Sequence, residues 1–253
     1  YCTELETGEA PRPNVNCLHD SLSLARLKRR ADGESWFWVT RLLLSLDFRD
    51  NPFNPTRGFF GSISAEHVSS LRPLTLITEG ADTDDPADDV YGDFMSNLIK
   101  FTTTVNGYIP LVLLDMVLAL SVRFGWIFEL IEDNITVADR FFYLGGFDSM
   151  RGFPEESMLA QDFSEYGGRS MINMRAELRI PIGSSFSLGV FLDTGNVWRE
   201  QINMWEDFAL RYNLGGGLRI NTPVGPLAFD GAFVLDRRTD ERLAFFHFAI
   251  GLF

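Results

Sequence analysis

The stretch INMRAELRIPIGSSFSLGVFLDTGNVW, residues 172–198, decides the fold because it holds two runs of period-two alternation joined by a short turn. In the first run, apolar Ile172, Met174, Ala176, Leu178 and Ile180 alternate with polar Asn173, Arg175, Glu177 and Arg179. In the second run, Phe186, Leu188, Val190 and Leu192 alternate with Ser187, Gly189, Phe191 and Asp193. Successive side chains of a strand point to opposite faces, so the pattern predicts an antiparallel pair with one apolar face.

Strand-like segments of this kind recur along the chain. We count about nine of them, at 36–50, 58–68, 94–111, 117–128, 170–183, 186–198, 210–223, 225–238 and 244–253. Short Pro, Gly and Asn turns alternate with longer polar links, at 69–93, 129–169, 199–209 and 237–243. A soluble sandwich can also alternate, with its apolar face inward. Alternating short and long links favour an all-β fold, a transmembrane antiparallel β-barrel.

Aromatic residues support the barrel. Seven of them gather at the ends of segments beside long links: Trp36, Phe37, Trp38, Trp126, Phe128, Trp198 and Trp205. Aromatic girdles of barrels lie at such positions, near the membrane–water interface. The apolar stretch 108–128 could instead be a membrane helix, but Asp115 and Arg123 interrupt it and its alternation favours strand, turn and strand.

Nine is an odd number of strands, whereas bacterial barrels usually have an even number. The chain therefore resembles the C-terminal part of a larger barrel, at 36–253, with its earlier strands absent or supplied separately. If the long links are extracellular, residues 1–35 form an extracellular loop. Cys2 and Cys17 both lie in this loop, where they could form a disulfide in an oxidising compartment or remain free thiols.

Composition excludes several classes of function. The formal net charge of −13 argues against nucleic acid as a partner, because phosphate binding needs a dense basic face. No Cys/His spacing indicates a metal, and no motif indicates a cofactor. Ser64 and His67 lie on opposite faces of a strand, which does not suit a nucleophile and its base. We therefore expect no enzymatic activity.

Five motifs carry a family resemblance. They are LDFRDNPFNPTRGFF (46–60), YLGGFDSMRGF (143–153), GVFLDTGNVW (189–198), LGGGLRINTPVGPLAFDGAF (214–233) and FHFAIGLF (246–253). Their order and spacing resemble the BamA superfamily of outer-membrane barrels. The resemblance implies the last nine of sixteen strands and an extracellular loop, 129–169, that folds into the lumen.

The motif Met150, Arg151, Gly152 and Phe153 lies within that loop. The resemblance implies that Arg151 contacts an acidic and aromatic patch on the inner wall. Alternation indicates the same partners, since Glu177, Phe191 and Asp193 share the polar face of the next two strands. A guanidinium can fork onto carboxylates and stack on a ring, and because lysine cannot do both, Arg151→Lys should be damaging.

The resemblance further implies an outer-membrane protein assembly factor, which folds and inserts barrels through a weak lateral seam. The seam strand would carry Phe246, Phe248, Ile250, Gly251 and Phe253. Implied partners are the outer-membrane bilayer and its lipopolysaccharide, unfolded outer-membrane proteins, accessory lipoproteins and upstream POTRA domains. A translocation-assembly factor, a two-partner-secretion transporter and a passive pore are the alternatives.

Overall fold

The structure is a computed structural model. It describes residues 35–72, 74–78, 90–111, 115–131, 134, 136–158, 167–183, 186–200, 203–206, 208–222, 225–238 and 241–250. The predicted loop 1–35, apart from its last residue, lies outside these ranges, and so does its candidate disulfide between Cys2 and Cys17. Gly251 and Phe253 of the predicted seam strand lie outside them too.

Nine strands form one antiparallel sheet in which consecutive strands are neighbours, with a single insertion between β2 and β5. The strands are β1 (Phe37–Asp47), β2 (Gly58–Ser70), β5 (Asn97–Leu111), β6 (Met116–Glu129), β7 (Ser170–Pro181), β8 (Phe186–Trp198), β9 (Arg211–Thr222), β10 (Gly225–Val234) and β11 (Ala244–Ile250). The predicted nine-stranded antiparallel sheet is confirmed. The stretch 108–128 contributes to β5 and β6, as its alternation indicated.

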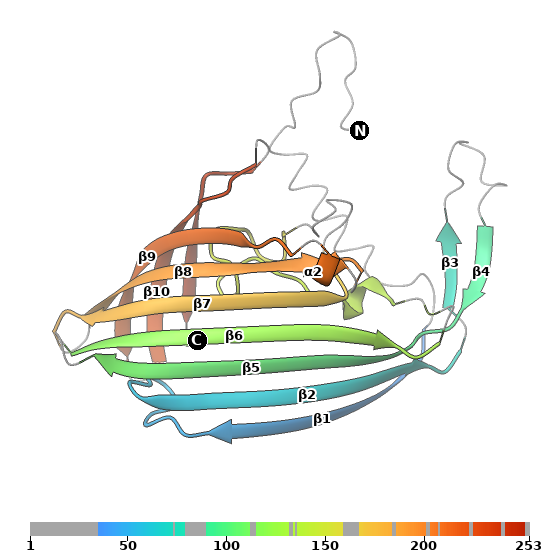
Figure 1. The fold of residues 1–253 in the computed structure, drawn as a ribbon, viewed down its shortest axis with the longest axis horizontal. Helices are drawn as coiled ribbons and strands as arrows, with labels where there is room; N and C mark the ends of the chain where they lie inside the picture. The colour runs from blue at the N-terminus through green and yellow to red at the C-terminus, as the bar shows by residue number, and fades with distance from the viewer. Residues whose placement is uncertain are drawn as a thin grey trace, which may run out of the picture.

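The insertion is a separate two-stranded sheet of β3 (Leu74–Thr78) and β4 (Val90–Phe94), which Figure 1 shows projecting beyond one end of the main sheet. The long polar link predicted at 69–93 therefore contains strand β3 and most of strand β4, which the sequence reasoning did not predict. The sequence LTLIT contains three β-branched residues, Thr75, Ile77 and Thr78, which favour a strand even where the flanking residues are polar. Among the described residues, no helix is long and apolar enough to cross a membrane.

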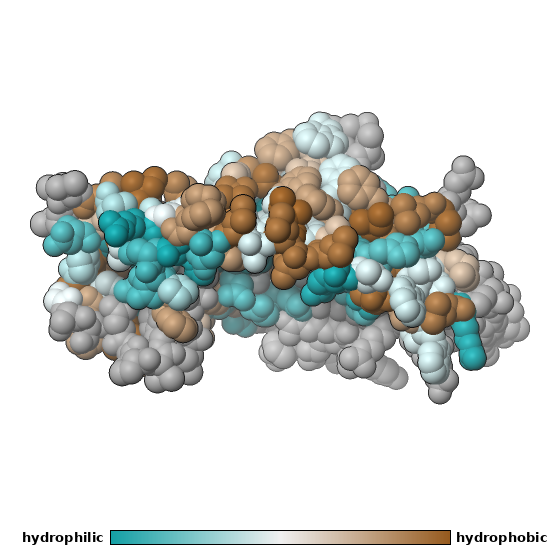
Figure 2. Space-filling view, turned by 90° about the horizontal axis from the view of Figure 1, so that it is seen from below, coloured by the Kyte–Doolittle hydropathy of each residue, from teal (hydrophilic) through white to brown (hydrophobic). Residues whose placement is uncertain are grey.

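The sheet buries its polar face and exposes its apolar face, the reverse of a sheet in a soluble protein. On β7 and β8 the charged residues Arg175, Glu177 and Asp193 are buried. The apolar residues Leu188 and Val190 of β8 remain 42% and 48% exposed. Figure 2, which looks from below toward the β1 edge, shows apolar residues between polar clusters on this side of the molecule. An apolar outer face and a polar inner face are what a barrel wall in a bilayer requires.

The inner face is covered by residues 136–158 of the long loop between β6 and β7. Figure 1 shows a curved wall, with β10 behind β8 and β9 in this view, and the loop running within the curve. An apolar cluster joins loop and wall, and its members are Val68, Leu98, Ile127, Phe141, Phe142, Leu144, Met150, Phe153, Met158, Met171, Val197 and Val234. The core of this curved sheet thus lies between the loop and the strands.

Candidate functional site

The candidate site is the tip of the long loop, and its backbone is fixed by a glycine pair. Gly145 and Gly146 have φ of 115° and 95°, a conformation that other residues rarely adopt. The Gly146 amide donates to the Phe153 carbonyl at 3.0 Å, which closes the turn. Ser149 closes it further, because its hydroxyl accepts from the Gly145 amide at 2.9 Å. The turn holds Arg151 toward the wall.

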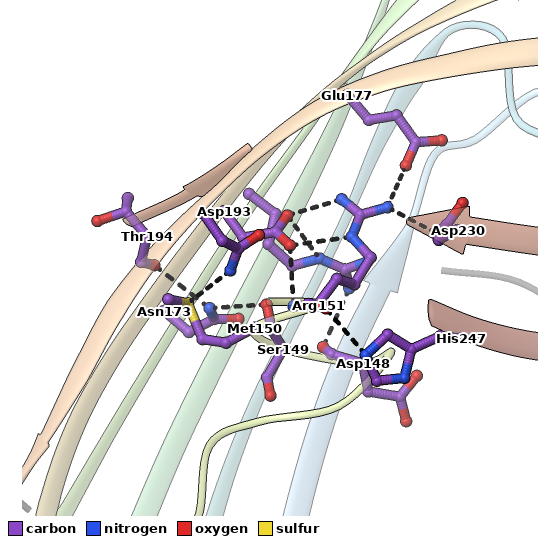
Figure 3. Close-up of polar contacts among 12 residues, drawn as sticks. Asp148, Ser149, Met150, Arg151, Asn173, Glu177, Asp193, Thr194, Asp230 and His247 are labelled. Carbon is purple, nitrogen blue, oxygen red and sulfur yellow. Dashed lines mark hydrogen bonds and ion pairs between the residues drawn. The ribbon is translucent and has the colours of Figure 1, made fainter. Parts of the chain in front are cut away.

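Arg151 is completely buried and binds three carboxylates on three strands (Figure 3). Its Nε and Nη2 donate to the two oxygens of Asp193 on β8, at 2.9 and 2.6 Å. Its Nη1 donates to Glu177 on β7 at 2.7 Å and to Asp230 on β10 at 3.2 Å. The fork onto Asp193 is the strong bidentate geometry of arginine and carboxylate.

The position of Arg151 depends on the curvature of the wall. Neighbouring strands lie about 4.8 Å apart, so β7 and β10 would be about 14 Å apart on a flat sheet. One guanidinium reaches both only because the strands turn toward each other. Burial alone would lower the pKa of Arg151, but the hydrogen bonds and charge of Asp193, followed by the charge of Glu177, outweigh it and raise that pKa.

The ring of Phe191 completes the pocket. The guanidinium carbon of Arg151 lies 3.3 Å from the ring centre, a cation–π stack. Gly215, opposite Phe191 on β9, leaves space for this ring, because a Cβ there would lie 2.5 Å from it. The structure therefore brings together Arg151 and all three partners that alternation indicated, Glu177, Phe191 and Asp193.

The other motif residues pack beside the arginine. Met150 and Phe153 belong to the apolar cluster, and the Phe153 ring faces Arg211 at 5.0 Å. A Cβ on Gly152 would lie 2.7 Å from the Cβ of Asn213 on β9. Gly152 therefore permits close approach of the loop backbone to the wall.

Two residues of the charged network around Arg151 were not predicted from the sequence. Asp230 on β10 and Arg219 on β9 face the same interior, and Arg219 donates to Asp230 and, at 3.0 Å, to Glu177. Their alternation could have assigned them to the polar face. Each buried carboxylate of the site thus has a cationic partner, as buried charges require.

Comparison with known proteins assigns the family. A model of the Omp85 superfamily domain matches residues 5–253, almost the whole chain. The chain belongs to the Omp85 superfamily. This Omp85 chain is 25% identical over 146 residues, 44% of its length, to the outer membrane protein assembly factor BamA of Neisseria meningitidis serogroup B. It is 28% identical over 154 residues, 57% of its length, to the protein of the same name from Neorickettsia risticii.

The Omp85 chain spans only 18% and 20% of the lengths of these curated relatives. Its fold is similar to the crystal structure of BamA from Haemophilus ducreyi lacking POTRA domains 1–3, with a TM-score of 0.62 and 20% identity, over 84% of this chain and 42% of that one. The outer-membrane barrel predicted from the sequence is thus confirmed. The relatives are named as assembly factors, in agreement with a non-enzymatic Omp85 chain.

The Omp85 loop is held at its base as well as at its tip. Lys100 on β5 donates to the carbonyls of Arg140 and Phe141, at 2.8 and 3.2 Å. Arg140, which ends the short helix η3 (Ala138–Arg140), pairs with Glu66 on β2 at 3.3 Å. Neither contact was predicted, because a lysine on a strand does not reveal which loop carbonyls it will meet.

Lys100→Met should loosen this base of the Omp85 loop without releasing the tip. Methionine keeps an apolar stem but loses the ammonium donors, so two part-buried carbonyls lose a partner, at a cost of about 1 kcal/mol. Hydrogen exchange of residues 138–143 should rise while residues 149–153 stay protected. Arg57→Met, at an exposed turn, is the matched control. Unchanged exchange over 138–143 would show that Lys100 does not hold the loop.

The predicted seam strand β11 is the last strand of the Omp85 sheet. Among the described residues it pairs only with β10, from Leu227 opposite Ile250 to Phe233 opposite Ala244. Phe246 and Phe248 face outward and are 85% and 58% exposed. Phe246 covers Gly231 across the strand pair, with ring atoms 3.0 Å from where a Cβ would stand.

Proposed function

We propose that this chain is the C-terminal part of the barrel of an outer-membrane protein assembly factor, which folds and inserts β-barrel proteins through a seam at β11. One observation carries the proposal: Arg151 docks the loop tip onto Glu177, Asp193 and Asp230, on the inner wall of a sheet whose outer face is apolar. The curated relatives are named as assembly factors, which supports the same activity.

An unpaired strand edge presents a row of amide and carbonyl groups that can pair with another strand. Inside a bilayer the incoming strand gains most from this edge, since no water satisfies its backbone. We propose unfolded outer-membrane proteins as substrates, with the bilayer and lipopolysaccharide around the apolar wall. Accessory lipoproteins and upstream POTRA domains are proposed partners of the full-length protein.

The test is an insertion assay with the full-length protein in lipid vesicles. A urea-denatured eight-stranded barrel is diluted into the vesicles, and its folded fraction is followed by resistance to heat in gel electrophoresis. The wild type and Arg57→Ala should accelerate folding several-fold over empty vesicles, and Arg151→Ala should accelerate it less. Steady ion flux without acceleration would indicate a passive pore. Passage of an unfolded polypeptide into the vesicle lumen, without insertion, would favour the secretion transporter.

A translocation-assembly factor would insert a narrower set of proteins. Three unrelated barrels, of eight, twelve and sixteen strands, therefore form the second part of the test. Acceleration of all three supports a general assembly factor. Acceleration of one alone would overturn the general role in favour of the narrower one.

A further inference from the structure

The closing strand is attached to the loop by a histidine. His247 on β11 faces the interior, and its Nε2 lies 2.9 Å from the main-chain carbonyl oxygen of Arg151 (Figure 3). A carbonyl oxygen can only accept, so this nitrogen carries the proton and donates it. Both the neutral Nε2–H tautomer and the imidazolium can donate, so the contact does not require one protonation state.

The surroundings of His247 direct it toward the loop. Asp230 is its neighbour across the strand pair, but the Asp230 carboxylate already binds Arg151 and Arg219. The imidazole stacks on the ring of Phe245, with centres 6.5 Å apart. Its Nε2–H is thereby turned to the Arg151 carbonyl.

One loop residue therefore connects four strands. The Arg151 side chain binds β7, β8 and β10, and its carbonyl binds β11. We propose that His247 is a positioning residue that couples the closing strand to the docked loop, so that docking of the loop tip stabilises β11 beyond its pairing with β10. The use of this coupling during insertion rests on the proposed function, whereas the coupling itself does not.

Three substitutions separate a specific hydrogen bond from simple filling of space. His247→Leu fills similar space with an apolar side chain and removes the hydrogen-bond donor. His247→Gln places an amide N–H near the position of Nε2 and should rescue the contact. His67→Leu is the matched control. His67 lies on the distant strand β2 and also makes a side-chain hydrogen bond, to Asn97 at 3.0 Å.

The experiment is hydrogen exchange, read by mass spectrometry, on the full-length protein in lipid nanodiscs. His247→Leu should accelerate exchange of the β11 amides, residues 244–250, by several-fold to about tenfold. His247→Gln and His67→Leu should match the wild type. Arg151→Ala should accelerate β11 exchange even though His247 is present. Protection of β5 in every variant shows that the barrel is folded.

Equal β11 exchange in His247→Leu and His247→Gln would overturn the role of the hydrogen bond. Unchanged β11 exchange in Arg151→Ala would overturn the coupling to the loop. The insertion assay separates this inference from the proposed function. If β11 exchange follows the expected pattern while the wild type inserts no barrel, the coupling stands and the assembly function fails. If the wild type inserts barrels but β11 exchange is the same in Arg151→Ala and the wild type, only the coupling fails.

Discussion

Arg151→Ala is expected to release the loop tip from the barrel wall. Three buried carboxylates, Glu177, Asp193 and Asp230, would lose the cation that joins them. Removing one partner of a buried ion pair costs about 3–5 kcal/mol. The loss falls mainly on Asp193, whose bidentate partner is removed, because Glu177 and Asp230 keep Arg219. The tip also loses the stack on Phe191, and the loop is then held mainly at its base. Proteinase K added to cells should cut within residues 141–158 of the variant and spare the wild type.

Arg151→Lys should be partly cut under the same conditions. A lysine keeps the positive charge but offers neither the fork to Asp193 nor a flat group for Phe191. Arg57→Ala, which changes an exposed turn arginine, should resist like the wild type. Equal resistance of Arg151→Ala and the wild type would show that the arginine does not hold the loop.

Asp193→Asn is expected to have the second-largest effect. Asp193 accepts three hydrogen bonds from Arg151, two from the guanidinium and one from the main-chain amide at 3.2 Å. An asparagine of the same shape replaces one acceptor with a donor that faces the guanidinium, and it removes the charge. Hydrogen bonds to charged groups contribute about 1.5–3 kcal/mol each, so we expect a loss of about 3 kcal/mol or more.

The urea midpoint of unfolding in vesicles measures this loss. Glu177→Gln should lower the midpoint less, because Glu177 receives a single hydrogen bond from Arg151 within a network that Arg219 also supports. Double variants with Arg151→Ala should show strong coupling for Asp193 and weaker coupling for Glu177. A larger effect at Glu177 than at Asp193 would contradict the assigned geometry.

The strands and the face of each site residue could be predicted from the sequence, for one physical reason. Alternation reports the face of every residue, and in a barrel wall the polar face is interior. Glu177, Phe191 and Asp193 could therefore be assigned to one surface on the two strands that follow the loop. The turn motif supplied the remaining element, an arginine in a glycine-rich segment with apolar neighbours.

The contacts of Asp230 and His247 could not be predicted in the same way. Both alternate toward the interior, but their strands, β10 and β11, follow β8 by two and three strand connections. They reach Arg151 only because the sheet curves, and curvature arises from the twist and packing of the whole wall. The strands β3 and β4 were missed for a different reason. They are short, and the polar composition around them resembles that of a loop.

The central claim is that the loop tip lies on the inner wall and is held there by Arg151. A distance between two spin labels tests it directly in the full-length protein, with other cysteines replaced. Asp148→Cys labels the exposed side of the tip, and Leu214→Cys labels the outer face of β9. The structure predicts one narrow distance distribution, which Arg151→Ala broadens and shifts to longer distances. A broad distribution in the otherwise unchanged protein, or identical distributions with and without Arg151, would contradict the docked loop.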